Sequence, residues 1–309
     1  MAGRGDGDHG AGVGDATSEA ILMTMTHNGT RPADSTILQE DSFPKINRPR
    51  RENSPRTLFP HAWVQTKRLL MRFLRDPMTF FFGVVFPIFM LLVLDIVLGD
   101  AISAVTGNSA VYGSVPLMTV IGAMNGASVG AVGIIAEQND GMLARLWVTP
   151  IHRASGLLAR ITAEALRVVI NSVLLLAVGF ALGLRFEQGI PAAVAWVCVP
   201  VLFGVAFAIL VLTVALYWPS PTMVNAIVLV NSLCLFFSSG FVPLNQYPSW
   251  VQPAVEHQPV SYAIETMRGL SLGGPVLEPG IGILAWSGGI ILACLIPMVI
   301  GYRKASMRG

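Results

Sequence analysis

The sequence predicts an all-α polytopic membrane protein with six transmembrane helices, preceded by an amphipathic interfacial helix, and with re-entrant outer helices before the last span. Composition is the first reason: of 309 residues 53% are hydrophobic, 12% are charged, and the mean hydropathy is +0.63. Because a soluble domain carries roughly 25% charged residues, this chain has too little charge to cover a globular surface. The uneven distribution of charged residues along the chain is the second reason, since 20 of the 38 lie in the first 76 residues. The net charge of +2 argues against a nucleic-acid partner.

Residues 1–56 predict a disordered cytoplasmic tail. They are rich in Gly, Asp, Ser, Thr, Pro and Arg and have no sustained hydrophobic period, so they bury too little apolar surface to offset the entropy of ordering. They also lack the apolar core of about 7–15 residues that a secretory signal peptide needs. The basic stretch 45–56 either touches anionic headgroups or is simply solvated.

Residues 57–77 predict an amphipathic helix that ends at Pro77. At helical periodicity one side gathers the apolar residues Trp63, Leu69, Leu70, Phe73 and Leu74. The other side carries the basic residues Arg68, Arg72 and Arg75, with Lys67 close to them. An apolar face with aromatic residues opposite a basic face is typical of a helix that lies in the membrane interface and contacts its lipids. The alternative, a first turn of a longer spanning helix, is disfavoured by this concentration of basic residues.

Six apolar segments follow, each long enough for a hydrocarbon core of about 30 Å. They lie at residues 79–99, 113–136, 168–184, 190–217, 222–242 and 281–301. The fourth and fifth are joined only by residues 218–221, which predicts a tight hairpin. Residues 243–279 contain six prolines, which divide the segment into short helices that cannot span.

Basic residues next to the helix ends predict the orientation, because Lys and Arg favour the cytoplasmic side. The segments before the first span, between the second and third, and after the last hold 11 basic residues: Lys67, Arg68, Arg72, Arg75, Arg145, Arg153, Arg160, Arg167, Arg303, Lys304 and Arg308. The opposite segments hold only Arg185 and Arg268. Both termini, including the tail 304–309, are therefore expected in the cytoplasm of a bacterium, with the spans in its inner membrane.

Small residues define one face of the second span. Gly122, Gly126 and Gly130 recur every four positions, a spacing that lets another helix approach closely. Simple packing within the protein is one interpretation, and a surface that slides during a conformational cycle is the other. Polar residues in the spans either line a substrate path or form hydrogen bonds between helices: Asp95, Asn125, Ser128, Asn171, Asn225 and Asn231.

Enzymatic motifs are missing from the sequence. It has no phosphate-binding loop, no H-E-x-x-H and no G-x-S-x-G. Three cysteines lie singly in separate apolar runs: Cys198, Cys234 and Cys294. We therefore expect no catalytic residue, no metal site and no cofactor bound by this chain.

The segment 137–160 between the second and third spans predicts a short helix with one apolar side. Such a helix either docks into a groove on a partner or folds back on its own membrane domain, and composition leaves both open. The order Glu-x-x-x-Gly-x-Leu-x-Arg-Leu-x-Val-Thr-Pro resembles the coupling-helix signature of ABC-2-type transporter permeases. The matching residues are Glu137, Gly141, Leu143, Arg145, Leu146, Thr149 and Pro150. Residues 138–140, Gln-Asn-Asp, replace most of the charge that the family often carries there.

The resemblance implies that this loop contacts an ATPase. The residues it assigns to ATPase coupling are Glu137, Asp140, Gly141, Leu143, Arg145, Leu146, Trp147, Pro150, His152 and Arg153. It covers most of the chain from about residue 58, with an ABC-2 transmembrane domain at 78–303. The outer segment, with its His-Gln-Pro and Met-Arg-Gly-Leu-Ser-Leu-Gly-Gly-Pro stretches, resembles daunorubicin-resistance-type permeases of the mycobacterial DrrB/DrrC group.

The function that this resemblance implies is that of a permease subunit in an ATP-driven exporter. Its substrate would be hydrophobic, either a complex lipid such as phthiocerol dimycocerosate or a hydrophobic drug. Two copies of a cytoplasmic ATPase subunit would carry ATP and magnesium, and a second permease, identical or related, would complete the assembly. The alternatives are a secondary transporter or channel, disfavoured by the sparse intramembrane charge, and a lipid-modifying membrane enzyme, disfavoured by the missing motifs.

Overall fold

The computed structural model describes residues 55–142, 154–240 and 244–307, and the regular elements in these ranges are all helices. The long helices are α2 (Pro55–Arg75), α4 (Phe86–Thr106), α5 (Val111–Asn139), α7 (Ser155–Ala181), α8 (Ile190–Tyr217), α9 (Pro221–Phe236) and α12 (Leu277–Met307). The short ones are α3 (Pro77–Phe80), the π-helix η1 (Phe81–Val85), the 3₁₀-helix η2 (Leu244–Gln246), α10 (Gln252–His257) and α11 (Pro259–Leu272). The all-helical prediction is confirmed.

Five segments are long and apolar enough to cross a membrane. They are Pro77–Ala104, Val111–Asn139, Ser155–Ala181, Ile190–Tyr217 and Leu277–Ser306. Each predicted span has a helical counterpart, but α9 has only 16 residues. The prediction of 222–242 for this helix is therefore too long. The helix ends at Phe236, and the Ser238 hydroxyl just beyond it donates to the Leu235 carbonyl at 2.7 Å.

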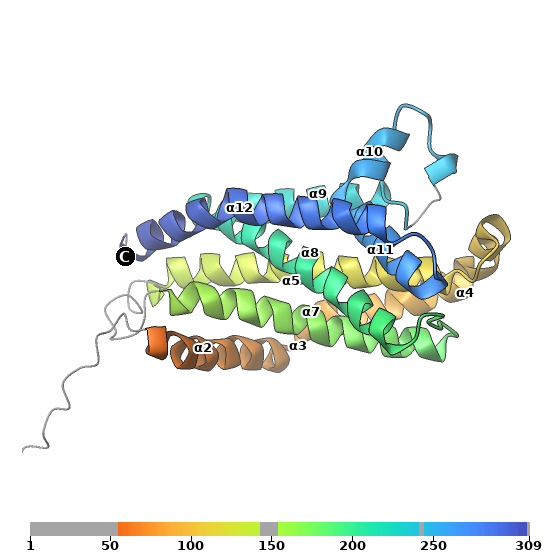
Figure 1. Cartoon of the computed structure of the whole chain (residues 1–309). Coiled ribbons are helices and arrows are strands. Elements are labelled where there is room, and N and C mark those ends of the chain that lie inside the picture. The colour runs from red at the N-terminus through yellow and green to blue at the C-terminus, as the bar shows by residue number, and fades with distance from the viewer. Residues whose placement is uncertain (1–54, 143–153, 241–243, 308–309) are drawn as a thin grey trace, which may run out of the picture. The chain divides into compact units, whose positions relative to one another are not determined.

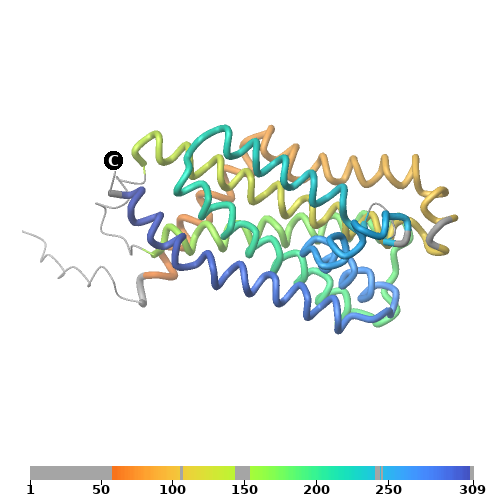
Figure 2. The backbone as a smooth tube through the Cα atoms, turned by 90° about the horizontal axis from the view of Figure 1, so that it is seen from above, coloured from red at the N-terminus to blue at the C-terminus, as the bar shows by residue number. Residues whose placement is uncertain are grey.

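The helices pack as a bundle in which α5, α7, α8 and α12 run alongside one another (Figures 1 and 2). Helix α8 contacts α5, α7 and α12, and α5 also contacts α7, α9 and α11. Large side chains such as Trp196, Phe203 and Leu117 are fully buried between these helices. Short helices α10 and α11 lie at the end of the bundle where α12 begins (Figure 1).

The third predicted span, 168–184, is displaced from the helix that the structure contains. Helix α7 begins at Ser155 and ends at Ala181. Charged residues in its first half do not interrupt it, because they are paired with one another and with neighbouring helices. Two residues after its end, Gly183 has a φ of 103°, a conformation that favours glycine.

Two prolines shape the beginning of the first span. Pro77 occupies the first position of α3, where its missing N–H costs nothing. Pro87 follows the π-helical turn η1, which relieves the clash between the proline ring and the preceding turn. The helix then continues beyond the predicted end at 99 to Thr106, where Gly107 adopts a φ of 72°.

Helix α2 lies beside the first half of α7 and runs in the same direction (Figure 1). The Gln65 amide donates to the Ser155 hydroxyl at 3.1 Å, and the Thr66 hydroxyl contacts the Ala159 carbonyl at 3.3 Å. Phe73 is buried at this contact, so part of the face expected in lipid packs on protein instead. The exposed apolar residues of α2 include Phe59, Trp63 and Leu74, whereas Lys67, Arg68, Arg72 and Arg75 are exposed on its polar side.

Candidate functional site

The loop between α5 and α7 contains the coupling residues expected from the sequence. Glu137, Asp140 and Gly141 are described, and Gly141 has a φ of 65° that favours glycine at the end of α5. The remaining expected coupling residues lie outside the described residues: Leu143, Arg145, Leu146, Trp147, Pro150, His152 and Arg153. The described residues on both sides show how this loop is anchored.

A buried carboxylate anchors the start of the loop. Glu137 is 4% exposed and forms an ion pair with Arg160 of α7. Its other carboxylate oxygen lies 3.4 Å from the Arg68 guanidinium of α2, and Arg68 also contacts the Met142 sulfur. Glu137 therefore joins three helices immediately before the loop.

The other end of the loop is fixed by α2 and α12. Ser155, the first residue of α7, accepts a hydrogen bond from Gln65 at 3.1 Å. A side chain at Gly156 would overlap the Tyr302 hydroxyl of α12, so glycine is needed for this close approach. Tyr302 is itself 6% exposed. The loop thus begins and ends on residues that several helices hold.

A second buried carboxylate, that of Glu164, lies about one turn beyond Arg160 along α7. Glu164 is 3% exposed, and its Oε2 accepts a hydrogen bond from Arg167 at 2.8 Å. The Arg167 guanidinium also stacks over the Phe73 ring of α2 at 5.4 Å, a cation–π contact. Glu164 fits against Gly126 of α5, where a Cβ atom would overlap its Oε1.

A cavity of about 160 Å³ lies between these charged groups. Its wall is formed by α2, the turn to α3, α5, α7 and α8, and includes Arg72, Asp76, Glu137, Arg160, Glu164 and Arg167. The Thr79 hydroxyl donates to the Asp76 carboxylate, and this hydrogen bond lowers the pKa of Asp76 below its usual value.

The residues proposed for a substrate path are dispersed. Asn231 of α9 donates to Ser128 of α5 at 3.2 Å, so these two meet. Asn171 of α7 is 4% exposed and lies against Gly122 of α5. Asp95 and Asn125 are half-buried on α4 and α5, and Asn225 is exposed on α9. The small-residue face of α5 therefore receives polar side chains of α7 within one chain.

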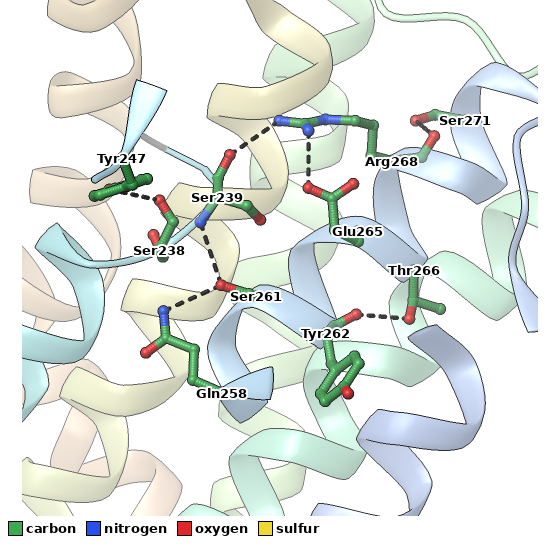
Figure 3. A network of polar contacts seen from close by, with 10 residues as sticks. All are labelled: Ser238, Ser239, Tyr247, Gln258, Ser261, Tyr262, Glu265, Thr266, Arg268 and Ser271. Carbon is green, nitrogen blue, oxygen red and sulfur yellow. Dashed lines mark hydrogen bonds and ion pairs between the residues drawn. The ribbon is translucent and has the colours of Figure 1, made fainter. Parts of the chain in front are cut away.

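A second polar network lies at the other end of α5 (Figure 3). Arg268 of α11 forms an ion pair with Glu265 at 2.9 Å and donates to the Ser239 carbonyl at 3.4 Å. The Ser239 N–H donates to the Ser261 hydroxyl at 3.2 Å, and Gln258 donates to the same oxygen at 3.1 Å. This network holds α11 against the chain that leaves α9.

Tyr247 also forms hydrogen bonds to the end of α9. Its hydroxyl donates to the carbonyls of Phe236 and Ser238 at 2.9 and 3.2 Å, and burial raises the pKa of Tyr247. Trp250, between η2 and α10, is 81% exposed. Among the described residues, no group of three His, Cys, Asp or Glu side chains is placed to hold a metal ion.

Comparison with known proteins assigns the family. Residues 60–272 match the ABC-2 type transporter family. The chain belongs to the ABC-2 transporter family. It is 45% identical over 272 residues to the probable doxorubicin resistance ABC transporter permease protein DrrC of Mycobacterium tuberculosis, covering 88% of this chain and 99% of DrrC. It is 23% identical over 262 residues to the daunorubicin resistance ABC transporter permease protein DrrB1 of Streptomyces coeruleorubidus, covering 84% of this chain and 88% of DrrB1.

The ABC-2 match includes both polar networks. It begins in the first turns of α2 and ends at the last residue of α11, so it also includes the loop between α5 and α7. The resemblance to DrrB and DrrC permeases is confirmed by these relatives. The multi-span apolar helices and the family together make this an integral membrane protein.

Sequence reasoning missed Glu164. It also assigned no role to the ion pairs of Arg160 with Glu137 and of Arg167 with Glu164. Arg160, Glu164 and Arg167 precede the third predicted span, 168–184, whereas the structure includes them in α7. Their spacing of four and three positions places them on one face of a helix, and this periodicity is the signal that was available. Gln65 and Tyr302 carry no comparable signal, because each meets its partner only through the tertiary packing.

Proposed function

We propose that this ABC-2 permease is the membrane-spanning subunit of an ATP-driven exporter and that residues 143–153 dock onto a cytoplasmic ATPase. The anchoring of both ends of that loop is the observation that supports this proposal most directly. Glu137 ties the start to α2 and α7, and Ser155 ties the other end to α2. A force applied to the loop would therefore reach several helices together.

In the proposed assembly, ATP hydrolysis and transport are carried out by different subunits. ATP and magnesium bind two copies of the partner ATPase, and this chain supplies the path through the inner membrane. A second permease, identical or related, completes the pair. Both termini lie in the cytoplasm, as the 11 basic residues of the alternate segments favour.

We propose a hydrophobic substrate, either a drug of the doxorubicin type or a complex lipid. The names of the relatives refer to doxorubicin and daunorubicin resistance, which makes doxorubicin the practical probe. Export rather than import is the direction that resistance to a drug requires.

Substituting two residues of the proposed docking segment with glutamate tests whether it couples ATP hydrolysis to transport. In Arg145→Glu combined with Leu146→Glu, we expect doxorubicin transport into inverted vesicles to fall about tenfold, equivalent to about 1.4 kcal/mol in the docking interaction. The amount of inserted protein should not change, because both positions lie between the second and third predicted spans. ATP hydrolysis and co-purification of the ATPase should fall in parallel.

The matched control is Arg185→Glu combined with Ile190→Glu at the opposite end of the bundle, where both side chains are exposed. This control changes charge and hydropathy equally and should leave ATPase binding intact. Unchanged transport and ATPase binding in the loop variant would refute the docking role. Doxorubicin movement without ATP or an ATPase would support a secondary transporter or channel instead.

A further inference from the structure

Helices α5 and α7 lie side by side and run antiparallel, and their facing residues follow a regular pattern (Figures 1 and 2). Asn171 of α7 lies against Gly122 of α5, and Glu164 lies against Gly126. Gly130 continues the same face one turn closer to the loop, and a Cβ atom placed there would lie 3.9 Å from Glu164 Oε2. The glycine face therefore has room for side chains of α7 at positions one helical turn apart.

The Asn171 side chain is unsatisfied in the position that the structure gives it. The residue is 4% exposed, and neither its amide nitrogen nor its carbonyl oxygen has a hydrogen-bond partner among the described residues. Both atoms are fully buried, so water does not reach them. Because buried polar groups are normally satisfied, this arrangement of α5 and α7 carries a cost that a different arrangement would remove.

A polar residue that matches Asn171 lies one turn along α5. Asn125 is half-buried three positions after Gly122, and this spacing places it on the same side of the helix. Each carboxamide has N–H donors and a carbonyl acceptor, so the two side chains can satisfy each other. A displacement of α7 by one turn toward the loop, about 5 Å, would bring Asn171 from Gly122 to Asn125.

The ion pair near the loop has a counterpart in the displaced position. Arg160 of α7 pairs with Glu137 of α5, and Asp140 is exposed three positions further, at the end of α5. The same displacement carries Arg160 from Glu137 to Asp140. Arg68 of α2 contacts Glu137, and Arg72 lines the same cavity, so Glu137 retains a cation when α2 moves with α7. The buried charges are therefore compensated in both positions.

The surroundings of α7 allow such a displacement. Gly141, before α7, and Gly183, after it, have φ values of 65° and 103°, and a Cβ atom at either would meet nothing within 4 Å. These glycines let the chain at both ends of α7 change direction. At the α5–α7 contact α8 contributes another glycine, Gly204, which lies against Val168 of α7 and Ala123 of α5.

We propose that α7 alternates between two registers on α5, one helical turn apart. In the first register, which the structure shows, Asn171 faces Gly122 without a hydrogen bond and Arg160 pairs with Glu137. In the second register Asn171 pairs with Asn125, and Arg160 pairs with Asp140. A one-turn displacement of one packed element past another is a known way to switch between discrete states. The second register moves the start of α7 toward the cytoplasmic loop.

Disulfide formation between α5 and α7 distinguishes the two registers, in the full-length chain with its three native cysteines replaced. A Cβ atom at Gly179 would lie 3.1 Å from Val115 Cγ2, so Val115→Cys with Gly179→Cys gives a first-register disulfide. Thr119→Cys with Gly179→Cys, one turn further along α5, gives a second-register disulfide, and Val115→Ala is added there to relieve the contact with the new side chain. A disulfide needs Cβ atoms within about 4.5 Å, so each pair reports one register.

We expect both disulfides to form in membranes treated with a lipid-permeable oxidant such as copper phenanthroline. Asn125→Leu should slow the second-register disulfide about tenfold, equivalent to about 1.4 kcal/mol, and should not slow the first-register disulfide. Asn171→Leu should have the same effect and should also raise the unfolding temperature, because it removes an unsatisfied buried polar group. The matched control is Asn225→Leu, at an exposed position of α9, which should leave both rates unchanged.

Two results would overturn the proposal. One is the absence of the second-register disulfide while the first-register disulfide goes to completion. The other is an unchanged rate of the second-register disulfide in Asn125→Leu. Oxidation needs neither ATP nor an ATPase, so these outcomes are independent of the proposed transport function. A changed ratio of the two disulfides on adding the ATPase and ATP would support coupling of the register to ATP hydrolysis, and an unchanged ratio would contradict that coupling while leaving the two registers in place.

Discussion

At the scale of single residues, the buried charges near the loop are the least replaceable groups of this permease. Glu137 and Arg160 are 4% and 8% exposed and compensate each other, while Arg68 approaches from the surface. Removing one member of such a pair leaves the other uncompensated, and that loss exceeds what the intact pair contributes. These residues fix the positions of α2, α5 and α7 relative to one another.

Glu137→Gln should therefore destabilise the protein by about 3–5 kcal/mol, because Arg160 would remain buried without its counter-charge. Denaturation in detergent, followed by circular dichroism, measures the change. The control is Glu265→Gln, which removes a partner of Arg268 in a pair whose side chains are 39% and 29% exposed. A cost of about 1 kcal/mol or less is expected there. Equal losses in the two variants would contradict this account of Glu137.

At the scale of elements, the small-residue face of α5 accommodates polar side chains of α7. Gly122 lies against Asn171, and Gly126 lies against Glu164. Glycine at these positions is needed for space, since a methyl group would overlap atoms that are buried on both sides. The face is thus a packing surface within the chain, and it also fixes the position of a carboxylate that lines the cavity.

Gly126→Ala should lower the unfolding temperature, because the new methyl group displaces the Glu164 carboxylate from its ion pair with Arg167. The expected loss is about 1–3 kcal/mol. In Gly288→Ala the methyl group meets no atom, so the helix propensity of alanine should stabilise the protein by up to about 1 kcal/mol. A stabilised Gly126→Ala protein in the same thermal assay would show that Glu164 moves freely.

The Ser261 hydroxyl accepts two of the hydrogen bonds at the junction of α9 and α11. In Ser261→Ala, the buried Ser239 N–H loses its acceptor at 3.2 Å, which costs about 1–3 kcal/mol. Hydrogen exchange of the peptide containing Ser239 should become faster. Ser232→Ala is the control, because its hydroxyl donates to the Val228 carbonyl within α9. No difference between the two variants in exchange at Ser239 would argue that other contacts hold the junction.

Hydrophobic runs and prolines predict which helices exist, but not where charged helices begin. The fourth predicted span, 190–217, coincides with Ile190–Tyr217, because Pro191 and Pro219 lie at the ends of a long apolar run without a charged residue. Helix α7 starts earlier than predicted, because its charges are paired in three dimensions. Motif spacing likewise located the loop, whereas the contacts of Gln65 and Tyr302 depend on packing that no local pattern encodes.

At the scale of the whole molecule, α5 connects two polar networks at its opposite ends. Glu137 belongs to one, and Gly113 lies beside Arg268 of the other. A displacement of the loop would therefore reach the α9–α11 junction along a single helix that is mostly buried. Rigid helices with anchored ends are the elements through which such motion is transmitted.

The number of crossings decides on which side of the membrane the C-terminus lies. Helix α9 spans about 24 Å at 1.5 Å per residue, less than the ~30 Å hydrocarbon core, so it needs the following turn to complete a crossing. Six crossings place both termini on the same side. If α9 does not cross, residues 244–276 and the end of α12 each lie on the side of the membrane opposite to the one that six crossings would give them.

Thiol labelling distinguishes the two topologies. In a background without Cys198, Cys234 and Cys294, we expect Trp250→Cys to react with a membrane-impermeant maleimide in intact spheroplasts, because position 250 is exposed and six crossings would put it on the outer side. Lys304→Cys should react only after permeabilisation, since the basic end of α12 favours the cytoplasm. Both positions are exposed, so reactivity reports sidedness rather than burial. The reverse pattern would mean that α9 turns back within the membrane and that the protein crosses it five times.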